Sequence, residues 1–261
     1  MGIEVANALS GNDIVIIEND KEKVDILTQS VDALVIQGNA TRMDILEQAG
    51  FDDADAVIAL TDNDETNLLV AMLATKKGKK VVARVNEQSH VDMFKNAGIK
   101  SPVIPEKKAA EVIARKISEK SVDIRHVIIV GGGTLGIALA NNLPEQIAIL
   151  IEIDDKVCDS ARKETGEGTL VVQGDATQMD VLERAGINKT DLVAAMTDND
   201  QINLLVATQA MQKGKEVIAR VKDSGHDRLF RELGVKNIVM PDKSAAIAIA
   251  KEIKEFGDKE K

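Results

Sequence analysis

Residues 126–154 read HVIIVGGGTLGIALANNLPEQIAILIEID, and this stretch decides the fold. An apolar run too short for a helix, residues 126–130, leads into three consecutive glycines. An alanine-rich segment with the spacing of a buried helix follows, and then a second apolar run that ends in acidic residues. The order of strand, glycine turn, helix and strand predicts the opening of a doubly wound α/β sheet.

The glycine cluster has the pattern G-x-G-x-x-G, in which each glycine has a separate role. Gly131 allows the tight turn, Gly133 allows the backbone to approach a pyrophosphate, and Gly136 allows the helix to lie close to the strand. Thr134 and Leu135 open the helix, where free N–H groups and the helix dipole favour an anion. The pattern predicts a nucleotide site; in the alternative, the glycines only tighten a strand-to-helix turn.

An acidic residue follows at the spacing that such sites use. Glu152 lies 21 residues after Gly131, at the end of the second predicted strand. A carboxylate there accepts hydrogen bonds from the adenosine ribose. The spacing predicts NAD(H), or another adenine nucleotide with a free 2′-hydroxyl.

The composition disfavours several classes of partner. The chain has 261 residues, an apolar share of 44% and a net charge of −10, which indicates packed domains and disfavours nucleic acid or anionic membrane as a partner. No apolar run approaches the roughly 20 residues that span a bilayer, and the first residues lack the features of a signal peptide. We therefore expect a cytoplasmic protein. Its single cysteine, Cys158, leaves no intrachain disulfide and no thiol metal site.

Catalytic groups are scarce. The chain has no tyrosine, no tryptophan and three histidines, so it cannot carry the Tyr/Lys pair of short-chain dehydrogenases and has few general bases. The composition favours a binding protein over an enzyme.

The sequence is a tandem repeat. Residues 37–50 and 173–186 are identical at 10 of 14 positions, and the offset of 136 continues through 61–64 and 197–200. A period this long predicts two whole domains, which we place at 1–120 and 126–261 with a linker at 121–125. In the second, strands are expected at 126–130, 147–152, 169–173, 191–196, 216–221 and 237–240. Amphipathic helices at 106–119 and 242–256 follow the sixth strand of each repeat.

The first repeat opens differently. Met1-Gly2-Ile3 aligns with Leu135-Gly136-Ile137, which places Glu18 on Glu152, while the first strand and the first two motif glycines have no counterpart. Loss of a central strand leaves backbone groups unpaired. We expect either that the recorded sequence begins late, which we favour, or that another segment fills the gap. The second repeat alone has a phosphate cradle, so the two nucleotide sites should be unequal.

Further candidates lie at the ends of the other predicted strands. Asp175 and Ala176 follow the third strand, and Asn39 takes the place of Asp175 in the first repeat. The acid could bond an adenine or a ribose, or it could form an Asx turn.

The stretches at 61–64 and 197–200 follow the fourth strand. Thr61 and Thr197 are nucleotide-site candidates at this edge, whereas Asp62 and Asp198 are expected to cap the next helix with Glu65 and Gln201. A divalent-cation site is the alternative for these oxygens.

Arg84 and Arg220 end the fifth strands, where each could bind a phosphate or form a structural ion pair. His90 and His226 lack a nearby nucleophile or ligand cluster, which favours surface or capping roles.

Five stretches together, at 130–136, 151–154, 174–177, 194–203 and 217–221, resemble the TrkA N-terminal (KTN or RCK) family of potassium-transport regulators. The resemblance implies two tandem Rossmann-like domains in a cytoplasmic, peripheral subunit that binds NAD(H) or ATP/ADP and gates a membrane potassium-transporting subunit. It also implies assembly as a homo-oligomer. Family members usually follow each N-terminal domain with a small C-terminal ligand-binding domain, and we recognise neither of these domains in the sequence. The competing interpretations are an NAD-dependent oxidoreductase and a nucleotide-free scaffold.

Overall fold

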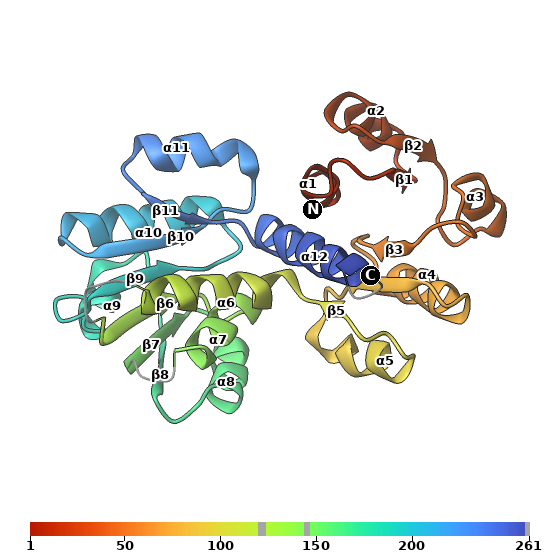
Figure 1. The fold of residues 1–261 in the computed structure, drawn as a ribbon. Helices are drawn as coiled ribbons and strands as arrows, with labels where there is room; N and C mark the ends of the chain where they lie inside the picture. Colours follow the sequence, from red (N-terminus) through yellow and green to blue (C-terminus); the bar gives the residue numbers. More distant parts are fainter. Residues whose placement is uncertain (120–123, 144–146, 259–261) are drawn as a thin grey trace. The chain divides into compact units, whose positions relative to one another are not determined.

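The computed structural model describes residues 1–119, 124–143 and 147–258, and it separates into two compact units (Figure 1). Unit 1 comprises Met1–Pro105 with Asp242–Lys261, and unit 2 comprises Glu106–Pro241. Most of the linker expected at 121–125 lies outside the described residues. Each unit is described by itself below.

Unit 2 contains one parallel six-stranded sheet in the order β11-β10-β9-β6-β7-β8. The central strand β6 pairs on one side with β7 and on the other with β9. This confirms the doubly wound fold predicted from the sequence. The strands are β6 (His126–Val130), β7 (Ile147–Glu152), β8 (Thr169–Gln173), β9 (Leu192–Ala195), β10 (Glu216–Arg220) and β11 (Asn237–Val239).

Helices cover both faces of this sheet because β6 is apolar on both sides. Val127 and Ile129 face one core cluster, and Ile128 and Val130 face the other. Burial on both faces is typical of parallel sheets. The helices of unit 2 are α6 (Pro105–Ser118), α7 (Thr134–Asn141), α8 (Asp155–Glu164), α9 (Met179–Arg184), α10 (Asp200–Gln212) and α11 (Asp227–Glu232), with a 3-10 turn at Ser224–His226.

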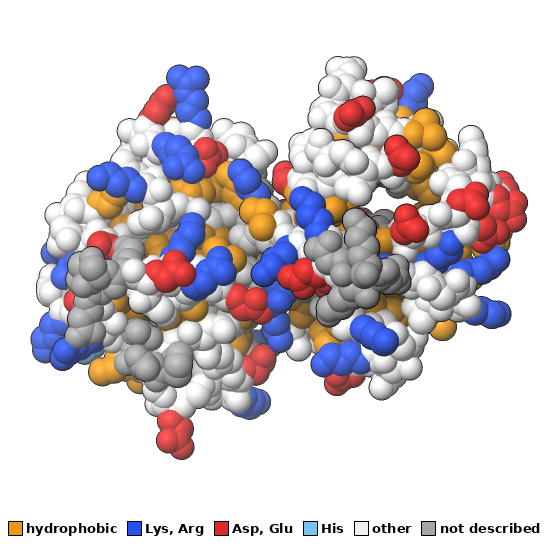
Figure 2. Space-filling model, viewed as in Figure 1, with side chains coloured by type: hydrophobic (Ala, Val, Ile, Leu, Met, Phe, Trp, Pro, Cys, Tyr) orange, Lys and Arg blue, Asp and Glu red, His pale blue; other side chains and the backbone are white. Residues whose placement is uncertain are grey.

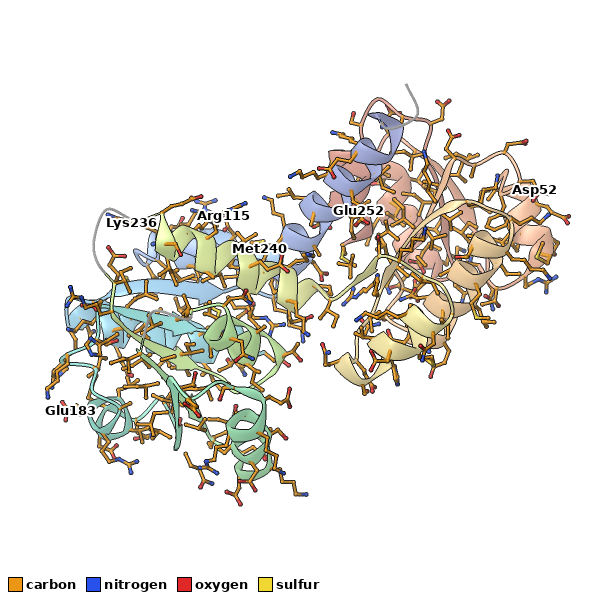
Figure 3. All side chains as sticks on the ribbon, turned by 60° about the horizontal axis from the view of Figure 1, so that its bottom comes forward. Asp52, Arg115, Glu183, Lys236, Met240 and Glu252 are labelled. Carbon is orange, nitrogen blue, oxygen red and sulfur yellow. The ribbon has the colours of Figure 1, made fainter. Side chains whose placement is uncertain are left out.

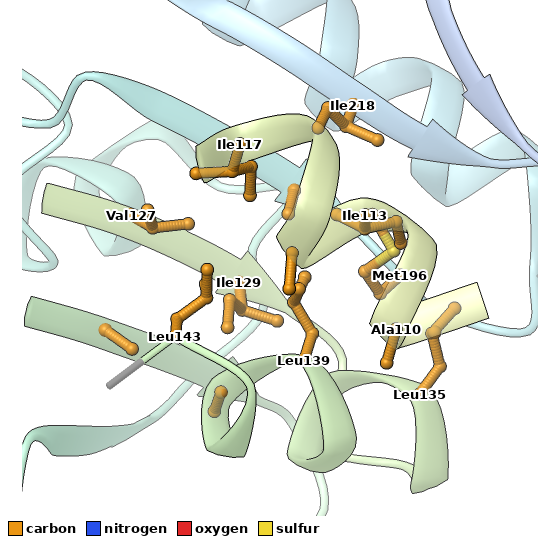
Figure 4. Packing of buried hydrophobic residues seen from close by; sticks show 14 of the residues in the cluster. Ala110, Ile113, Ile117, Val127, Ile129, Leu135, Leu139, Leu143, Met196 and Ile218 are labelled. Atoms are coloured by element: carbon orange, nitrogen blue, oxygen red, sulfur yellow. The ribbon is translucent and has the colours of Figure 1, made fainter. Parts of the chain in front are cut away.

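The first core cluster joins α6, α7 and the sheet (Figure 4). Ile113 and Ile117 of α6 lie among Leu135 and Leu139 of α7 and Ile129 of β6, and each is at most 2% exposed. The helix that begins at the glycine turn is therefore fixed on the sheet by α6.

Unit 1 has two separate sheets. β1 (Val15–Glu18) pairs with β2 (Leu34–Gln37), and β3 (Ala56–Ala59), β4 (Lys80–Arg84) and β5 (Pro102–Val103) form the other. Its helices are α1 (Gly2–Ala8), α2 (Lys21–Ser30), α3 (Met43–Gln48), α4 (Asp64–Lys76), α5 (Val91–Asn96) and α12 (Pro241–Asp258), with a 3-10 turn at Gln88–His90.

The two sheets of unit 1 are separate at the position where the repeat predicts a central strand. β1 corresponds to β7 and β3 to β9, and among the described residues no strand joins them as β6 does in unit 2. Ile17 and Val57 are consequently half-buried, whereas their counterparts Ile151 and Val193 are 1% and 0% exposed. The missing strand agrees with the repeat alignment, and an upstream source for it stays a prediction.

The last helices are exchanged relative to the repeats. α6 follows the first repeat but packs in unit 2, and α12 follows the second repeat but packs in unit 1. In unit 1, Ala245 and Ile249 of α12 are buried beside Val5 and Leu9, and Ser101 donates a hydrogen bond to Glu252 (labelled in Figure 3). The domain boundaries predicted from the sequence, 1–120 and 126–261, place each of these helices in the same domain as the repeat that precedes it. Both helices carry the same apolar stripe, so the pattern could not tell which sheet buries it.

The open position between β1 and β3 leads to a stability prediction. A copy of residues 124–134 placed before Met1 should form the central strand of unit 1. The added ladder hydrogen bonds and the burial of four apolar side chains should raise the free energy of unfolding by a few kcal/mol, net of chain entropy. Urea unfolding and hydrogen exchange at β1 and β3 measure this gain.

The control is the same extension with proline at the two positions copied from Ile128 and Ile129, since proline cannot donate to a central ladder. Equal unfolding midpoints for the two extended chains would contradict a strand-shaped gap.

Candidate functional site

The turn after β6 requires glycine at two of its positions. Gly131 has φ +107°, and a Cβ built there would lie 3.0 Å from the backbone N of Thr197. A Cβ on Gly136 would lie 1.9 Å from the carbonyl oxygen of Gly131. The first glycine thus permits the turn against the end of β9, and the last permits α7 to start against the turn.

Gly133 differs because it faces open space. It is exposed, has an ordinary φ of −74°, and a Cβ there would meet no atom within 4 Å. It forms the N-cap of α7, and no described side chain caps this helix. The N–H groups at the start of α7 are therefore suited to an anion. Thr134 is exposed, whereas the Leu135 side chain is in the core, which leaves only its backbone N–H for a ligand.

Glu152 at the end of β7 is tied to the same turn. Its Oε2 accepts a hydrogen bond of 2.7 Å from the Gly132 N–H, and its Oε1 accepts from the N–H groups of Ile153 and Asp154 at 2.7 and 2.9 Å. The structure thus brings the predicted ribose acceptor and the glycine turn together. It also gives the carboxylate a second role, in holding the turn, which sequence spacing did not indicate. In unit 1, Glu18 accepts a hydrogen bond of 2.9 Å from the Asp20 N–H.

The two kinds of glycine should respond differently to substitution. Gly136→Ala should destabilise unit 2 because its Cβ collides with backbone that cannot move aside, whereas Gly133→Ala should leave the unfolding midpoint nearly unchanged. Thermal and urea unfolding of the two variants measure this. Equal losses from both would show that Gly133 is held as tightly as Gly136.

Asp175 forms the Asx turn that was one of its two predicted roles. Its Oδ1 accepts from the Thr177 N–H at 2.9 Å and from the Thr177 hydroxyl at 2.7 Å, and these bonds hold the pKa of Asp175 below its ordinary value. Asn39 makes the same turn with Thr41 in unit 1, and Ala176 is 6% exposed. A contact of Asp175 with a ligand stays a prediction.

Asp198 and Asp62 do not cap the helices that follow, and that expectation was wrong. The caps are Asn199, which accepts from the N–H groups of Gln201 and Ile202, and Asn63, which accepts from the Thr66 N–H. The amide one residue later reaches the first turn of the helix, and this frees Asp198 for another partner.

That partner is Arg220, at the end of β10. The guanidinium lies 2.5 Å from Asp198 Oδ1 through Nη1 and 3.6 Å from Glu106 Oε1 of α6 through Nη2. In unit 1, Arg84 Nη1 lies 3.9 Å from Asp242 Oδ1 of α12. Both arginines therefore form the structural ion pairs that were one of their two predicted roles. Binding of a phosphate by either arginine stays a prediction.

Sequence reasoning missed two buried asparagines. Asn203 and Asn67 are 0% exposed and occupy the same position of the repeat. Asn203 binds the turn at Thr197 and the carbonyl of Arg220, and Asn67 binds the turn at Thr61 and the carbonyl of Arg84. Their identity in both repeats, six residues after the threonine, was the available signal.

The histidines have buried partners. His226 Nδ1 lies 2.7 Å from Asp200 Oδ2, and His90 Nδ1 lies 2.8 Å from Asp64 Oδ2. Burial tends to raise the pKa of Asp200, but hydrogen bonds from His226 and the N–H groups of Lys222 and Asp223 outweigh it and lower the pKa. The bond to Asp200 raises the pKa of His226, and Asp64 does the same for His90.

These pairs predict a pH dependence of stability. A raised histidine pKa contributes stability that is complete below the ordinary value of 6.5 and is lost as pH rises through the folded value. The aspartates contribute above their ordinary value of 3.8, so they do not change this trend at neutral pH. The urea midpoint should fall between pH 6 and pH 9.

The matched control is the double variant His90→Asn/His226→Asn, whose amide can donate from the position of Nδ1 but does not titrate. The midpoint of the unaltered protein should exceed that of the variant most at pH 5 to 6. A difference that stays constant with pH would show that the histidines do not charge.

On the face drawn in Figure 2, basic and acidic side chains are interspersed. Among the described residues, no group of three or more His, Cys, Asp or Glu side chains is placed to hold a metal ion. In the same part of the chain, no helix has both the length and the apolar character needed to cross a membrane.

Comparison with known sequences gives a family match in both halves. The profile of the TrkA-N domain matches residues 1–105 and 127–241. A Trk system potassium uptake protein TrkA homolog from Archaeoglobus fulgidus is 26% identical, over 92% of this chain and 76% of its own length. A homolog of the same name from Methanothermobacter thermautotrophicus is 36% identical, over 51% of this chain and 62% of its own length.

Two solved structures share the fold. The GsuK channel bound to NAD superimposes with a TM-score of 0.72 at 15% identity, covering 98% of this chain and 62% of its own. GsuK bound to ADP gives 0.71 at 19% identity, covering 98% of this chain and 66% of its own. The chain thus spans less than two thirds of these proteins, and at this identity the likeness concerns the fold alone.

Proposed function

Because this chain belongs to the TrkA-N domain family, we propose that it is a nucleotide-binding regulatory subunit of a potassium uptake system. Unit 2 would hold NAD(H) or an adenine nucleotide, and ligand binding would shift the population of two arrangements that a membrane potassium-transporting subunit distinguishes. The subunit would act at the inner face of the membrane through that partner, as a homo-oligomer. The names of the relatives support the transport role.

One observation carries the nucleotide part of the proposal. The exposed start of α7, with the open Cα of Gly133, lies beside the carboxylate of Glu152 at the carboxyl edge of the sheet. This edge is where open α/β sheets bind nucleotides, with the pyrophosphate on the helix N-terminus and the ribose on the acid. GsuK, which has the same fold, has been solved with NAD and with ADP.

A catalytic role is not part of the proposal. An oxidoreductase needs a proton donor or acceptor beside the nicotinamide. At this edge, Asp175 is engaged in its turn, Asp198 in an ion pair, and Asp200 with His226. A screen for NADH oxidation with common carbonyl substrates tests this, and steady turnover would favour the enzyme.

Calorimetric titration with ADP and with NAD tests the proposal itself. We expect one tight site per chain, located in unit 2, because Gly131 and Gly133 have no counterpart among the residues of unit 1. Gly133→Val should abolish binding while the fold is kept, since its side chain would fill the space of the pyrophosphate. Two equal sites per chain, or binding that survives Gly133→Val, would place the ligand elsewhere.

A second prediction concerns Glu152. Glu152→Gln should weaken ADP about ten- to hundredfold, because a hydrogen bond to a charged group contributes about 1.5–3 kcal/mol. Since Glu152 also holds the Gly132 N–H, the comparison needs 2′,3′-dideoxy-ADP, whose affinity should change little.

Glu18→Gln is the matched substitution in unit 1 and should leave both affinities unchanged. If Glu152→Gln weakens the dideoxy nucleotide as much as ADP, the carboxylate acts through the turn rather than through the ribose.

A further inference from the structure

Asn203 is a buried residue that joins two strand ends beside the glycine turn. Its Oδ1 accepts hydrogen bonds from the Thr197 N–H at 2.9 Å and from the Thr197 hydroxyl at 2.7 Å. Its Nδ2 donates to the Thr197 carbonyl at 2.9 Å and to the Arg220 carbonyl at 3.0 Å. All the hydrogen-bonding capacity of one amide thus fixes the chain after β9 to the end of β10.

The turn at Thr197, which Asn203 holds, packs directly against the glycine turn. The backbone of Met196 and Thr197 comes within 3.0 to 3.2 Å of a Cβ built on Gly131, so the two backbones are in contact. A hydrogen bond of 2.8 Å from the Met196 N–H to the Val130 carbonyl joins the strands just before this point. A small shift of Thr197 would therefore either collide with Gly131 or release it from its conformation.

Asn203 itself cannot touch a ligand on α7 without leaving its partners. It is 0% exposed, and it lies in the first turns of α10 behind the Thr197 turn. A binding site that needs its groups within a fraction of an ångström depends on such supporting residues. Any effect of Asn203 on a ligand must pass through its partners Thr197 and Arg220, and of these Thr197 is the one that contacts Gly131.

We propose that Asn203 is the positioning residue of the nucleotide site, setting the glycine turn in its binding geometry through Thr197. The inference rests on the proposed function, because it deepens the account of the same site. Nucleotide affinity should therefore depend on a buried amide that makes no ligand contact. The dependence should be confined to unit 2, where the glycine turn contacts the backbone of Thr197 that Asn203 holds.

Unit 1 supplies a matched control inside the same chain. Asn67 is also 0% exposed and makes the corresponding four bonds, to the Thr61 N–H, hydroxyl and carbonyl and to the Arg84 carbonyl, at 2.8, 2.8, 2.9 and 3.0 Å. Among the described residues of unit 1, no glycine turn lies against Thr61. Loss of Asn67 should therefore cost stability in the same way as loss of Asn203, without a cost in nucleotide affinity.

The test measures ADP affinity and the urea midpoint of Asn203→Leu, Asn203→Asp and Asn67→Leu in the full chain. Asn203→Leu should weaken ADP at least tenfold and Asn67→Leu less than twofold, while both lower the midpoint. Asn203→Asp keeps the acceptor for Thr197 but buries a carboxylate oxygen against the carbonyl oxygens of Thr197 and Arg220, so it should weaken ADP at least as much as Asn203→Leu. Equal ADP affinities for the folded Asn203 and Asn67 variants would overturn the inference.

A measurement on the unaltered protein covers variants that fail to fold. Because coupling between two sites is reciprocal, ADP should tighten the bond that Asn203 makes. Amide exchange at Thr197 should slow on addition of ADP, and exchange at Thr61 should not. Equal responses of the two amides would overturn the inference, whereas failure of the unaltered protein to bind either ADP or NAD would instead overturn the proposed function.

Discussion

The ladder that β6 makes on both of its edges is the constraint on which unit 2 depends. Pairing with β7 and β9 brings the glycine turn out between Glu152 and Thr197, so the acid, the open helix start and the supporting turn meet at one edge. In unit 1 the corresponding residues are Glu18, which ends β1, and Thr61, which follows β3, and these two strands belong to different sheets. The proposed site therefore depends on one strand, which joins in unit 2 the two strand ends that lie in different sheets in unit 1.

Buried polar groups hold this edge in addition to the apolar packing beneath it. Asn203 and Asp200, both in the first two turns of α10, bind the chain after β9 and the chain after β10. Unpaired, each of these groups would cost about 1–3 kcal/mol, so the loops they hold have few alternatives. Unit 1 keeps the same bonds through Asn67 and Asp64, and no glycine turn lies beside them in the described part of that unit. Their first effect is thus on the fold, and only in unit 2 does it reach a candidate site.

Much of this could be predicted from the sequence. The six strands of unit 2, the glycine turn and the placement of Glu152 follow from local periodicity, glycine conformation and motif spacing, which are short-range properties. The role of Asp198 could not be predicted, because the cap depends on whether Asp198 or Asn199 reaches the helix, and Arg220 competes for the acid. The bond from Gly132 to Glu152 spans 20 residues and the bond from Asn203 to the Arg220 carbonyl spans 17, so no local sequence pattern predicts them.

The exchange of α6 and α12 could not be predicted from the local sequence pattern, for a further reason. The two helices carry interchangeable stripes, with Ala109 and Ile113 matched by Ala245 and Ile249, so hydrophobic burial alone permits either arrangement. The acids in their first turns are matched as well: Glu106 meets Arg220 in unit 2, and Asp242 meets Arg84 in unit 1. The hydrophobic core of each unit is therefore completed by the helix that follows the other repeat in the sequence. Without α6, residues 126–261 would leave uncovered the side of α7 and β6 that α6 packs against, and α12 would lack the apolar residues of unit 1 that it packs against.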